Sequence, residues 1–332
     1  VTNGGRKLKR SAQAFATKGQ GGSWIGFMRI ALVTHGFPPK ETMGTEWHSY
    51  LLAKELSKKH SIYVFSKGRG EAYSEYGEEF DGIPVKRINT PISERKFLET
   101  YVDDRVALSF SEFLDDLEPD LIHIQHCIGL GVSIIEVAVQ KQIPTVLFLH
   151  DFYLMCHTVH LLKPNGKPCP GPRSQRYCAE CIQSFDRSLS DMEARNLGIE
   201  RYHHVQGLLS RIDRIVVPSE FVKKMFQQNF PKIREITIST LGLDLRFTKN
   251  YRKKQSRRLR FGYLGVVCWH KGLHVLVEAF KRLNLRDVEL RIHGYGDPDY
   301  LKTLHDSARN TNIRLFGPYT HSELSKVLSE ID

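Results

Sequence analysis

The stretch LRFGYLGVVCWHKGLHVLVEAF, residues 259–280, decides the fold that the sequence predicts. It opens with an apolar run at 261–267 that glycines interrupt, which favours a strand. It closes with four apolar residues at helical spacing: Leu273, Leu276, Val277 and Phe280. Between the two lies a loop with Lys271 and Gly272, where helix N–H groups, the helix dipole and the lysine all favour an anion. The stretch therefore predicts a phosphate site, although an incidental Lys-Gly pair would give the same pattern.

The residues that follow repeat the alternation of strand and helix. Residues 288–296, VELRIHGYG, predict a second strand that ends in Gly-x-Gly. A helix at 300–308, a strand at 313–316 and the start of a helix at 321–328 come next. Such alternation is typical of an α/β fold with a parallel, doubly wound sheet, whose ligands bind outside the carboxyl ends of the strands.

These motifs resemble a known family. Gly265 and Lys271-Gly272 ahead of a leucine-rich helix, then 292–296 (IHGYG), then 316–317 (FG), are similar to the donor-binding half of family 4 glycosyltransferases. The resemblance implies retaining, sugar-nucleotide-dependent enzymes of the GT-B type, with two Rossmann-like domains facing across a cleft. The donor-binding residues that it implies are Gly44, Gly265, Lys271, Gly272, Gly294 and Gly296.

Composition bounds the class of protein. The chain has 332 residues, of which 41% are hydrophobic and 26% charged, which suggests a globular protein of about two domains. No apolar run approaches the roughly 18 residues that cross a bilayer. The net charge of +11 is concentrated locally, in residues 1–27 and 252–260. No nucleic-acid module with interleaved aromatics accompanies these clusters, so we expect a solvated segment or contact with an anionic membrane surface rather than nucleic acid.

The sequence predicts four segments. Residues 1–27 are expected to form a disordered basic leader before a natural start at Met28, or else a genuine basic arm, since they lack the apolar core of a secretion signal. An N-terminal, acceptor-side Rossmann-like domain follows at 28–243, and then a basic linker at 244–258. Residues 259–332 are expected to form a partial nucleotide-sugar-binding domain. We expect a cytoplasmic protein, with peripheral membrane contact as an open alternative.

The last segment contains only three strand–helix units, fewer than a domain of usual size needs. It therefore predicts a C-terminally truncated piece. The resemblance implies that two donor-binding glutamates would follow, so we expect the chain as given to transfer no sugar. Val266 also stands where the family often has an arginine for the donor pyrophosphate, which would leave that contact to Lys271.

The first domain is expected to begin with a strand at 29–34 and a helix at 45–56, with Gly44 at the helix N-terminus, where backbone can approach a ligand. It lacks G-x-G-x-x-G, which argues against a nicotinamide-dependent dehydrogenase. Residues 68–82 are rich in Gly, Glu and Tyr and predict a loop. The other predicted strands cover 62–66, 83–88, 121–125, 145–149, 211–219 and 236–239. The other predicted helices cover 102–117, 132–140, 186–207 and 220–228.

Two of the predicted strands end in histidine. His126 follows 121–125, and His150-Asp151 follows 145–149, so they are expected at the ligand edge of the sheet. An imidazole can bond a sugar hydroxyl, and a neighbouring carboxylate can set its tautomer. A strand-end histidine without any role is the alternative. The resemblance implies that His150 meets the donor sugar as the catalytic residue, with His126 and Asp151 on the acceptor side.

A Pro- and Gly-rich insertion at 156–181 contains four of the six cysteines: Cys156, Cys169, Cys178 and Cys181. Cys-x-x-Cys with two further thiols can hold a structural zinc ion, and His157 or His160 could substitute as a ligand. Free thiols, and a disulfide or an iron–sulfur cluster, remain as alternatives. The family resemblance extends to a subset of members with a similar insertion, whose metal it does not fix. No metal is expected in catalysis.

The function that follows is a retaining glycosyltransferase. It would move a sugar from a nucleotide-diphosphate sugar to a glycan, lipid-linked or small-molecule acceptor. Two other classes remain open. One is another sugar-nucleotide enzyme of this fold, such as an epimerase, and the other is a non-catalytic binding or interaction protein.

Overall fold

The computed structural model describes residues 26–90, 96–172, 176–242, 251–283 and 285–332. The chain forms two compact units, Val1–Gly242 and Leu243–Asp332. Residues 1–25, which are most of the predicted leader, and residues 243–250, which include the start of the predicted linker, lie outside the described residues.

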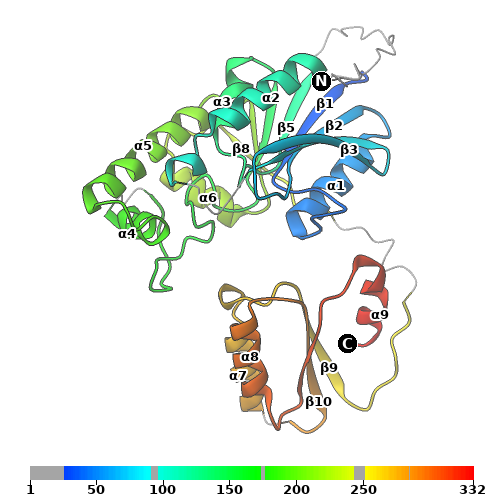
Figure 1. The fold of residues 1–332 in the computed structure, drawn as a ribbon. Coiled ribbons are helices and arrows are strands. Elements are labelled where there is room, and N and C mark those ends of the chain that lie inside the picture. The colour runs from blue at the N-terminus through cyan, green and yellow to red at the C-terminus, as the bar shows by residue number, and fades with distance from the viewer. Residues whose placement is uncertain (1–25, 91–95, 173–175, 243–250, 284) are drawn as a thin grey trace. The chain divides into compact units, whose positions relative to one another are not determined.

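The first unit is built on an eight-stranded sheet (Figure 1). Its strands are β1 (Arg29–Thr34), β2 (Ser61–Lys67), β3 (Ser74–Phe80), β4 (Ile83–Asn89), β5 (Leu121–Ile124), β6 (Thr145–Phe148), β7 (Arg214–Val217) and β8 (Ile236–Ile238). They lie in the order β3-β4-β2-β1-β5-β6-β7-β8. All neighbours are parallel except β3, which is antiparallel to β4. The predicted α/β class is confirmed.

Helices cover both faces of this sheet. They are α1 (Gly44–Leu56), α2 (Asp104–Leu117), α3 (Ser133–Gln140), α4 (Arg176–Phe185), α5 (Asp191–Leu209) and α6 (Glu220–Asn229), with a short 3-10 helix, η1 (Leu98–Thr100). Alternate side chains of β1 point to opposite faces. Ala31 and Val33 belong to the core beneath α2 and α3, whereas Ile30 and Leu32 belong to the core beneath α1 (Figure 1). Burial on both faces explains the continuous apolar run of this strand.

The prediction of a loop over 68–82 is wrong, because this segment contains the edge strand β3. The two strands β3 and β4 form a hairpin in which Phe80 pairs with Ile83. Asp81 and Gly82 between them have φ angles of 52° and 76°. A two-residue turn with both φ angles positive matches the right-handed twist of a hairpin, and Asp-Gly is a preferred sequence for it.

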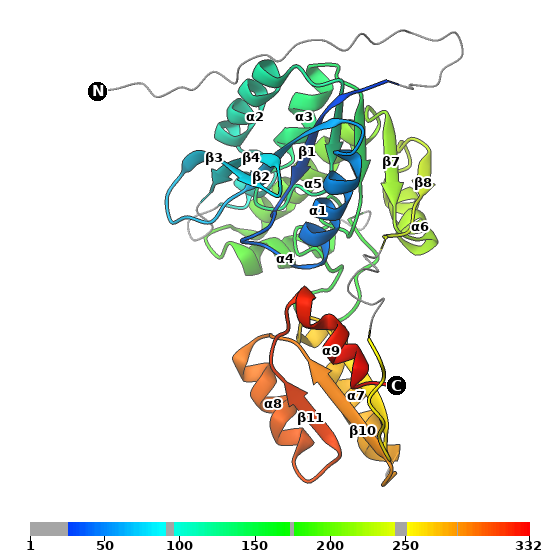
Figure 2. The same cartoon turned by 90° about the vertical axis from the view of Figure 1, so that its right-hand side faces the viewer.

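The second unit has a parallel sheet in the order β11-β10-β9. Its strands are β9 (Leu259–Leu264), β10 (Val288–His293) and β11 (Ile313–Phe316), and its helices are α7 (Leu273–Leu283), α8 (Pro298–Ala308) and α9 (Leu324–Ser329). Figure 2 shows α7 and α8 on one face of the sheet and α9 on the other. Part of the predicted basic linker lies against this unit. The side-chain ammonium of Lys254 is 2.5 Å from Glu330, and the backbone N–H of Lys254 donates to the Ser329 carbonyl at 2.8 Å.

A buried arginine fixes the loop between β1 and α1. Arg87 on β4 is fully buried. Its guanidinium lies 2.8 Å from Glu41 and 2.7 Å from Glu78. It also donates to the carbonyls of Phe37 and Pro38, at 2.7 and 3.0 Å. These bonds join the loop that leads to α1 to β4, the strand next to the edge strand β3, and so they position Gly44.

We expect Arg87→Met to lower the free energy of unfolding by about 3 kcal/mol, because it removes the buried partner of two carboxylates and leaves them only the more exposed Arg69 and Lys40. Guanidinium unfolding measures the change. The matched control is Arg195→Met on α5, whose ion pair with Asp191 is exposed and should contribute less than about 0.5 kcal/mol. Equal effects of the two substitutions would contradict this role for Arg87.

Candidate functional site

The carboxyl ends of three adjacent strands bring histidines together in the first unit. His35 follows β1, His126 follows β5, and His150 follows β6. The order of strands along the chain reverses between β1 and β5, which is where open α/β sheets bind their ligands. The ring centroids of His35 and His126 are 4.4 Å apart.

His126 is held in one tautomer. Its Nδ1 accepts from the Ile128 N–H at 3.1 Å, so its proton is on Nε2, which lies 2.9 Å from Asp151 Oδ2. The other oxygen of Asp151 accepts from the Tyr153 N–H at 2.8 Å. Burial opposes ionisation of Asp151, but the hydrogen bonds from His126 and from the Tyr153 N–H outweigh it and hold the pKa of that carboxyl below its usual value. The pair therefore presents an oriented anion at the sheet edge.

His150 is connected to a second histidine through an amide. His150 Nε2 lies 2.7 Å from Gln125 Oε1, and Gln125 Nε2 lies 2.8 Å from His123 Nε2. An amide oxygen only accepts and an amide nitrogen only donates, so His150 carries its proton on Nε2. Burial, with a smaller contribution from His48, lowers the pKa of His150 to about 3. The ring is neutral at neutral pH and keeps the Nδ1 lone pair, which can accept from a hydroxyl.

The start of α1 borders this cluster. Its N-cap residue, Met43, makes no side-chain capping bond, and a Cβ placed on Gly44 would meet no protein atom within 4 Å. Glu46 Oε1 is 3.2 Å from His35 Nε2, and the ring of His48 is 5.3 Å from that of His150. Open backbone at a helix N-terminus can receive an anion or a ligand oxygen.

Four residues of this cluster were not among the predicted site residues: His35, Glu46, His48 and Gln125. His35 follows its strand as His126 and His150 follow theirs, so the same reasoning could have found it. Gln125 directly precedes His126. Glu46 and His48 had no signal beyond their place in the first turns of the helix after Gly44.

In the second unit, the predicted donor glycines bring two loops into contact. A Cβ on Gly294 would lie 1.8 Å from the Gly265 carbonyl oxygen, and a Cβ on Gly296 would lie 1.8 Å from that of Val267. The Val267 N–H donates to the Tyr295 carbonyl at 2.8 Å. Only glycine permits this approach, so these positions shape the loops after β9 and β10 whether or not a ligand is bound.

Lys271 ends a 3-10 helix, η3 (Trp269–Lys271), and Gly272, with φ of 73°, leads into α7. The lysine is exposed, and within the described residues no carboxylate pairs with it. One N–H in the first turn of α7 is already occupied, because the His274 N–H donates to the Tyr300 hydroxyl at 3.0 Å. The loop thus offers a free cation beside the positive end of a helix dipole.

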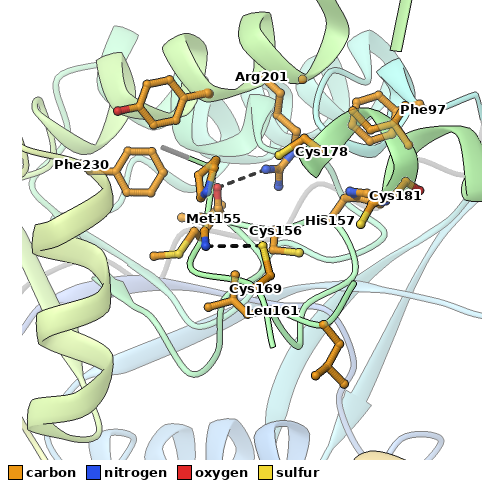
Figure 3. A pocket seen from close by; sticks show the side chains of 17 residues that line it. Phe97, Met155, Cys156, His157, Leu161, Cys169, Cys178, Cys181, Arg201 and Phe230 are labelled. Atoms are coloured by element: carbon orange, nitrogen blue, oxygen red, sulfur yellow. Dashed lines mark hydrogen bonds between the residues drawn. The ribbon is translucent and has the colours of Figure 1, made fainter. Parts of the chain in front are cut away.

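The four clustered cysteines line one cavity of 30 Å³ (Figure 3). All are free thiols. Burial raises the pKa of Cys178 to about 11 and that of Cys181 to about 12. Among the described residues, no three His, Cys, Asp or Glu side chains are placed so that they could hold a metal ion. The predicted ligands thus converge, although they do not form a finished coordination sphere.

The family model for Glycosyltransferase Family 4 matches residues 42–247. The chain belongs to this family. Its sequence matches no curated protein. Within the described part of this glycosyltransferase, no helix is both long enough and apolar enough to span a membrane.

Solved structures resemble this glycosyltransferase over most of its length. HepE of Anabaena, in complex with UDP and glucose, is 17% identical with a TM-score of 0.59, over 92% of this chain and 73% of that one. Sucrose-phosphate synthase of Thermosynechococcus elongatus is 14% identical with a TM-score of 0.62, over 91% and 73%. The catalytic domain of starch synthase IV of Arabidopsis thaliana, bound to ADP and acarbose, is 14% identical with a TM-score of 0.53, over 92% and 77%. The predicted GT-B class of fold is confirmed.

Buried neutral histidines make the stability of this glycosyltransferase depend on pH. Burial lowers the pKa values of His123 and His157 to about 4 and that of His150 to about 3. Below pH 6.5 the unfolded chain binds protons that the folded chain does not. We therefore expect the free energy of unfolding to fall as the pH decreases from 6.5 to 4, by up to about 1.4 kcal/mol per pH unit for each histidine.

The measurement is denaturant unfolding at several pH values. His150→Gln should reduce the slope of the free energy of unfolding against pH by up to about 1.4 kcal/mol per pH unit, the contribution of one histidine. His305→Gln, at an exposed position on α8, should leave it unchanged. Identical slopes for wild type and His150→Gln would show that His150 is not held neutral.

Proposed function

We propose that the protein transfers a sugar from a nucleotide-diphosphate sugar to a glycan, lipid-linked or small-molecule acceptor, with retention of anomeric configuration. The observation that carries the proposal is the free cation Lys271 at the start of α7, on a loop shaped by Gly265 and Gly294. A diphosphate fits a lysine beside a helix N-terminus. Complexes of the structurally similar HepE with UDP and of starch synthase IV with ADP support this assignment.

In the second unit, we assign the diphosphate of the donor to Lys271 and the backbone around Gly272. In the first unit, the open N-terminus of α1 at Gly44 can receive a ligand oxygen, and the neutral ring of His150 would accept a sugar hydroxyl through Nδ1. Positioning of the substrate and stabilisation of the departing diphosphate are the contributions that such a transfer needs from a protein. His126 and Asp151 would receive the acceptor hydroxyl, since Asp151 is an oriented anion.

A lipid-linked acceptor would lie at a membrane surface. The basic residues at 252–258 are mostly exposed, and such a cluster is attracted to anionic lipids. We propose this cluster as the peripheral contact.

For the transfer reaction, the complete protein is incubated with UDP-, ADP- and GDP-sugars and with glycan, small-molecule and lipid-linked acceptors. Proton NMR of the first product should show the anomeric configuration of the donor, and anionic vesicles should accelerate transfer to the lipid-linked acceptor more than neutral ones. An inverted product would exclude a retaining enzyme. Binding of nucleotide sugars without transfer to any acceptor would favour a non-catalytic protein.

Lys271→Ala should weaken the binding of UDP about tenfold to hundredfold, because it removes a charge-assisted contact with the diphosphate. Isothermal titration calorimetry measures the affinity. Lys302→Ala removes a charge at an exposed position of α8 and should leave the affinity unchanged. An unchanged affinity in Lys271→Ala would remove this loop from the donor site.

A further inference from the structure

Three separate pieces of the chain bring cysteine sulfurs to one cavity. Cys156 ends the segment that follows the sheet edge at His150. Cys169 ends a small hairpin, where its N–H donates to the Leu161 carbonyl at 2.7 Å. Cys178 and Cys181 are three residues apart on α4 and so share one side of the helix. The cavity of 30 Å³ has room for an ion or a water molecule.

A buried arginine faces the same cavity. Arg201 on α5 is 5% exposed and lines the cavity with the four cysteines (Figure 3). It donates to the carbonyls of Leu154 and Tyr153, at 3.3 and 2.5 Å. Its Nε is buried and has no partner among the described residues. Within the same residues, no carboxylate forms an ion pair with this guanidinium. A buried cation without an anion is costly, so the site calls for negative charge.

Two sulfurs also have polar neighbours. The Gly171 N–H donates to Cys169 Sγ at 3.5 Å, and Cys156 Sγ is 3.1 Å from Thr158 Oγ1. Hydrogen bonds to coordinating atoms are typical of the groups that orient metal ligands.

We infer that Cys156, Cys169, Cys178 and Cys181 bind one zinc ion as thiolates, and that Arg201 supplies the counter-charge. Each thiol releases one proton to solvent when its sulfur bonds to the metal. Four thiolates around Zn²⁺ carry a net charge of −2, which the guanidinium reduces to −1. Binding draws the sulfurs to tetrahedral distances of about 2.3 Å from the ion.

The zinc site is connected to the sheet edge through Arg201. The guanidinium bonds the carbonyl of Tyr153, whose N–H donates to Asp151 at 2.8 Å. Asp151 in turn bonds His126 at 2.9 Å. The zinc site itself does not depend on the proposed function.

Metal analysis of the purified protein tests the site. We expect about one zinc per chain and four thiols that resist modification in the native protein but react after chelation. Cys178→Ser should lose the zinc. Cys268→Ser is the matched control, because Cys268 is a free thiol in the second unit, and it should keep the zinc.

Arg201 is tested by competition of the zinc-loaded protein with a chelator. Arg201→Met should weaken the retention of zinc about tenfold, and Arg201→Lys, which keeps the charge, should recover part of the loss. Equal retention by wild type and Arg201→Met would remove the counter-charge role.

Three results would overturn the zinc site. The first is less than a tenth of a zinc per chain, with all four thiols reactive in the native protein. The second is iron with acid-labile sulfide, and the third is a disulfide between two of the four cysteines in mass spectra of the native chain. Binding of UDP, ADP and GDP is measured on the same samples. A protein that holds zinc but binds none of the three nucleotides would contradict the proposed function alone, and one that binds a nucleotide without zinc would contradict the zinc site alone.

Discussion

The parallel register of β1, β5 and β6 is the constraint on which the first unit's site depends. Val33 pairs with Ile124, and Ile124 pairs with Leu147, so the three strands end side by side. The residues that come next in the chain are then neighbours, although more than a hundred positions separate His35 from His150. A parallel sheet presents such residues at one edge without any dedicated motif.

Burial decides what these residues can do. The imidazoles of His35 and His150 are neutral because burial lowers their pKa values. The Gln125 amide then fixes which ring nitrogen of each histidine carries the proton, since its nitrogen donates to His123 and its oxygen accepts from His150. The result is a hydrogen-bonding surface with a fixed anion at Asp151 and no titrating histidine at His150. Such a surface suits the orientation of hydroxyl groups better than the transfer of protons through His150.

The sequence predicted the α/β class, most elements of both sheets and the place of His126 and His150, because the period of the apolar residues encodes each strand and helix locally. It missed β3, although Asp81-Gly82 is a hairpin signal, because the Gly- and Glu-rich composition around it was taken for a loop. The sequence did not predict which side chains contact one another. Nothing near Arg201 in the sequence indicates that it bonds carbonyls 47 and 48 residues away.

Two buried arginines lose their contact with water, and different groups compensate this desolvation in each case. Arg87 is neutralised by two carboxylates, and it also bonds the backbone of the loop before α1. Arg201 also donates to backbone carbonyls, in the loop after β6, but cysteines line its cavity where Arg87 has carboxylates. A buried guanidinium is stable only where negative charge compensates its loss of water. Two carbonyls and the ring of Tyr153, 5.8 Å from the guanidinium carbon, stabilise the Arg201 cation in part. Neutral thiols add no negative charge, whereas thiolates on a metal would, and this is why the proposed zinc site suits the surroundings of Arg201.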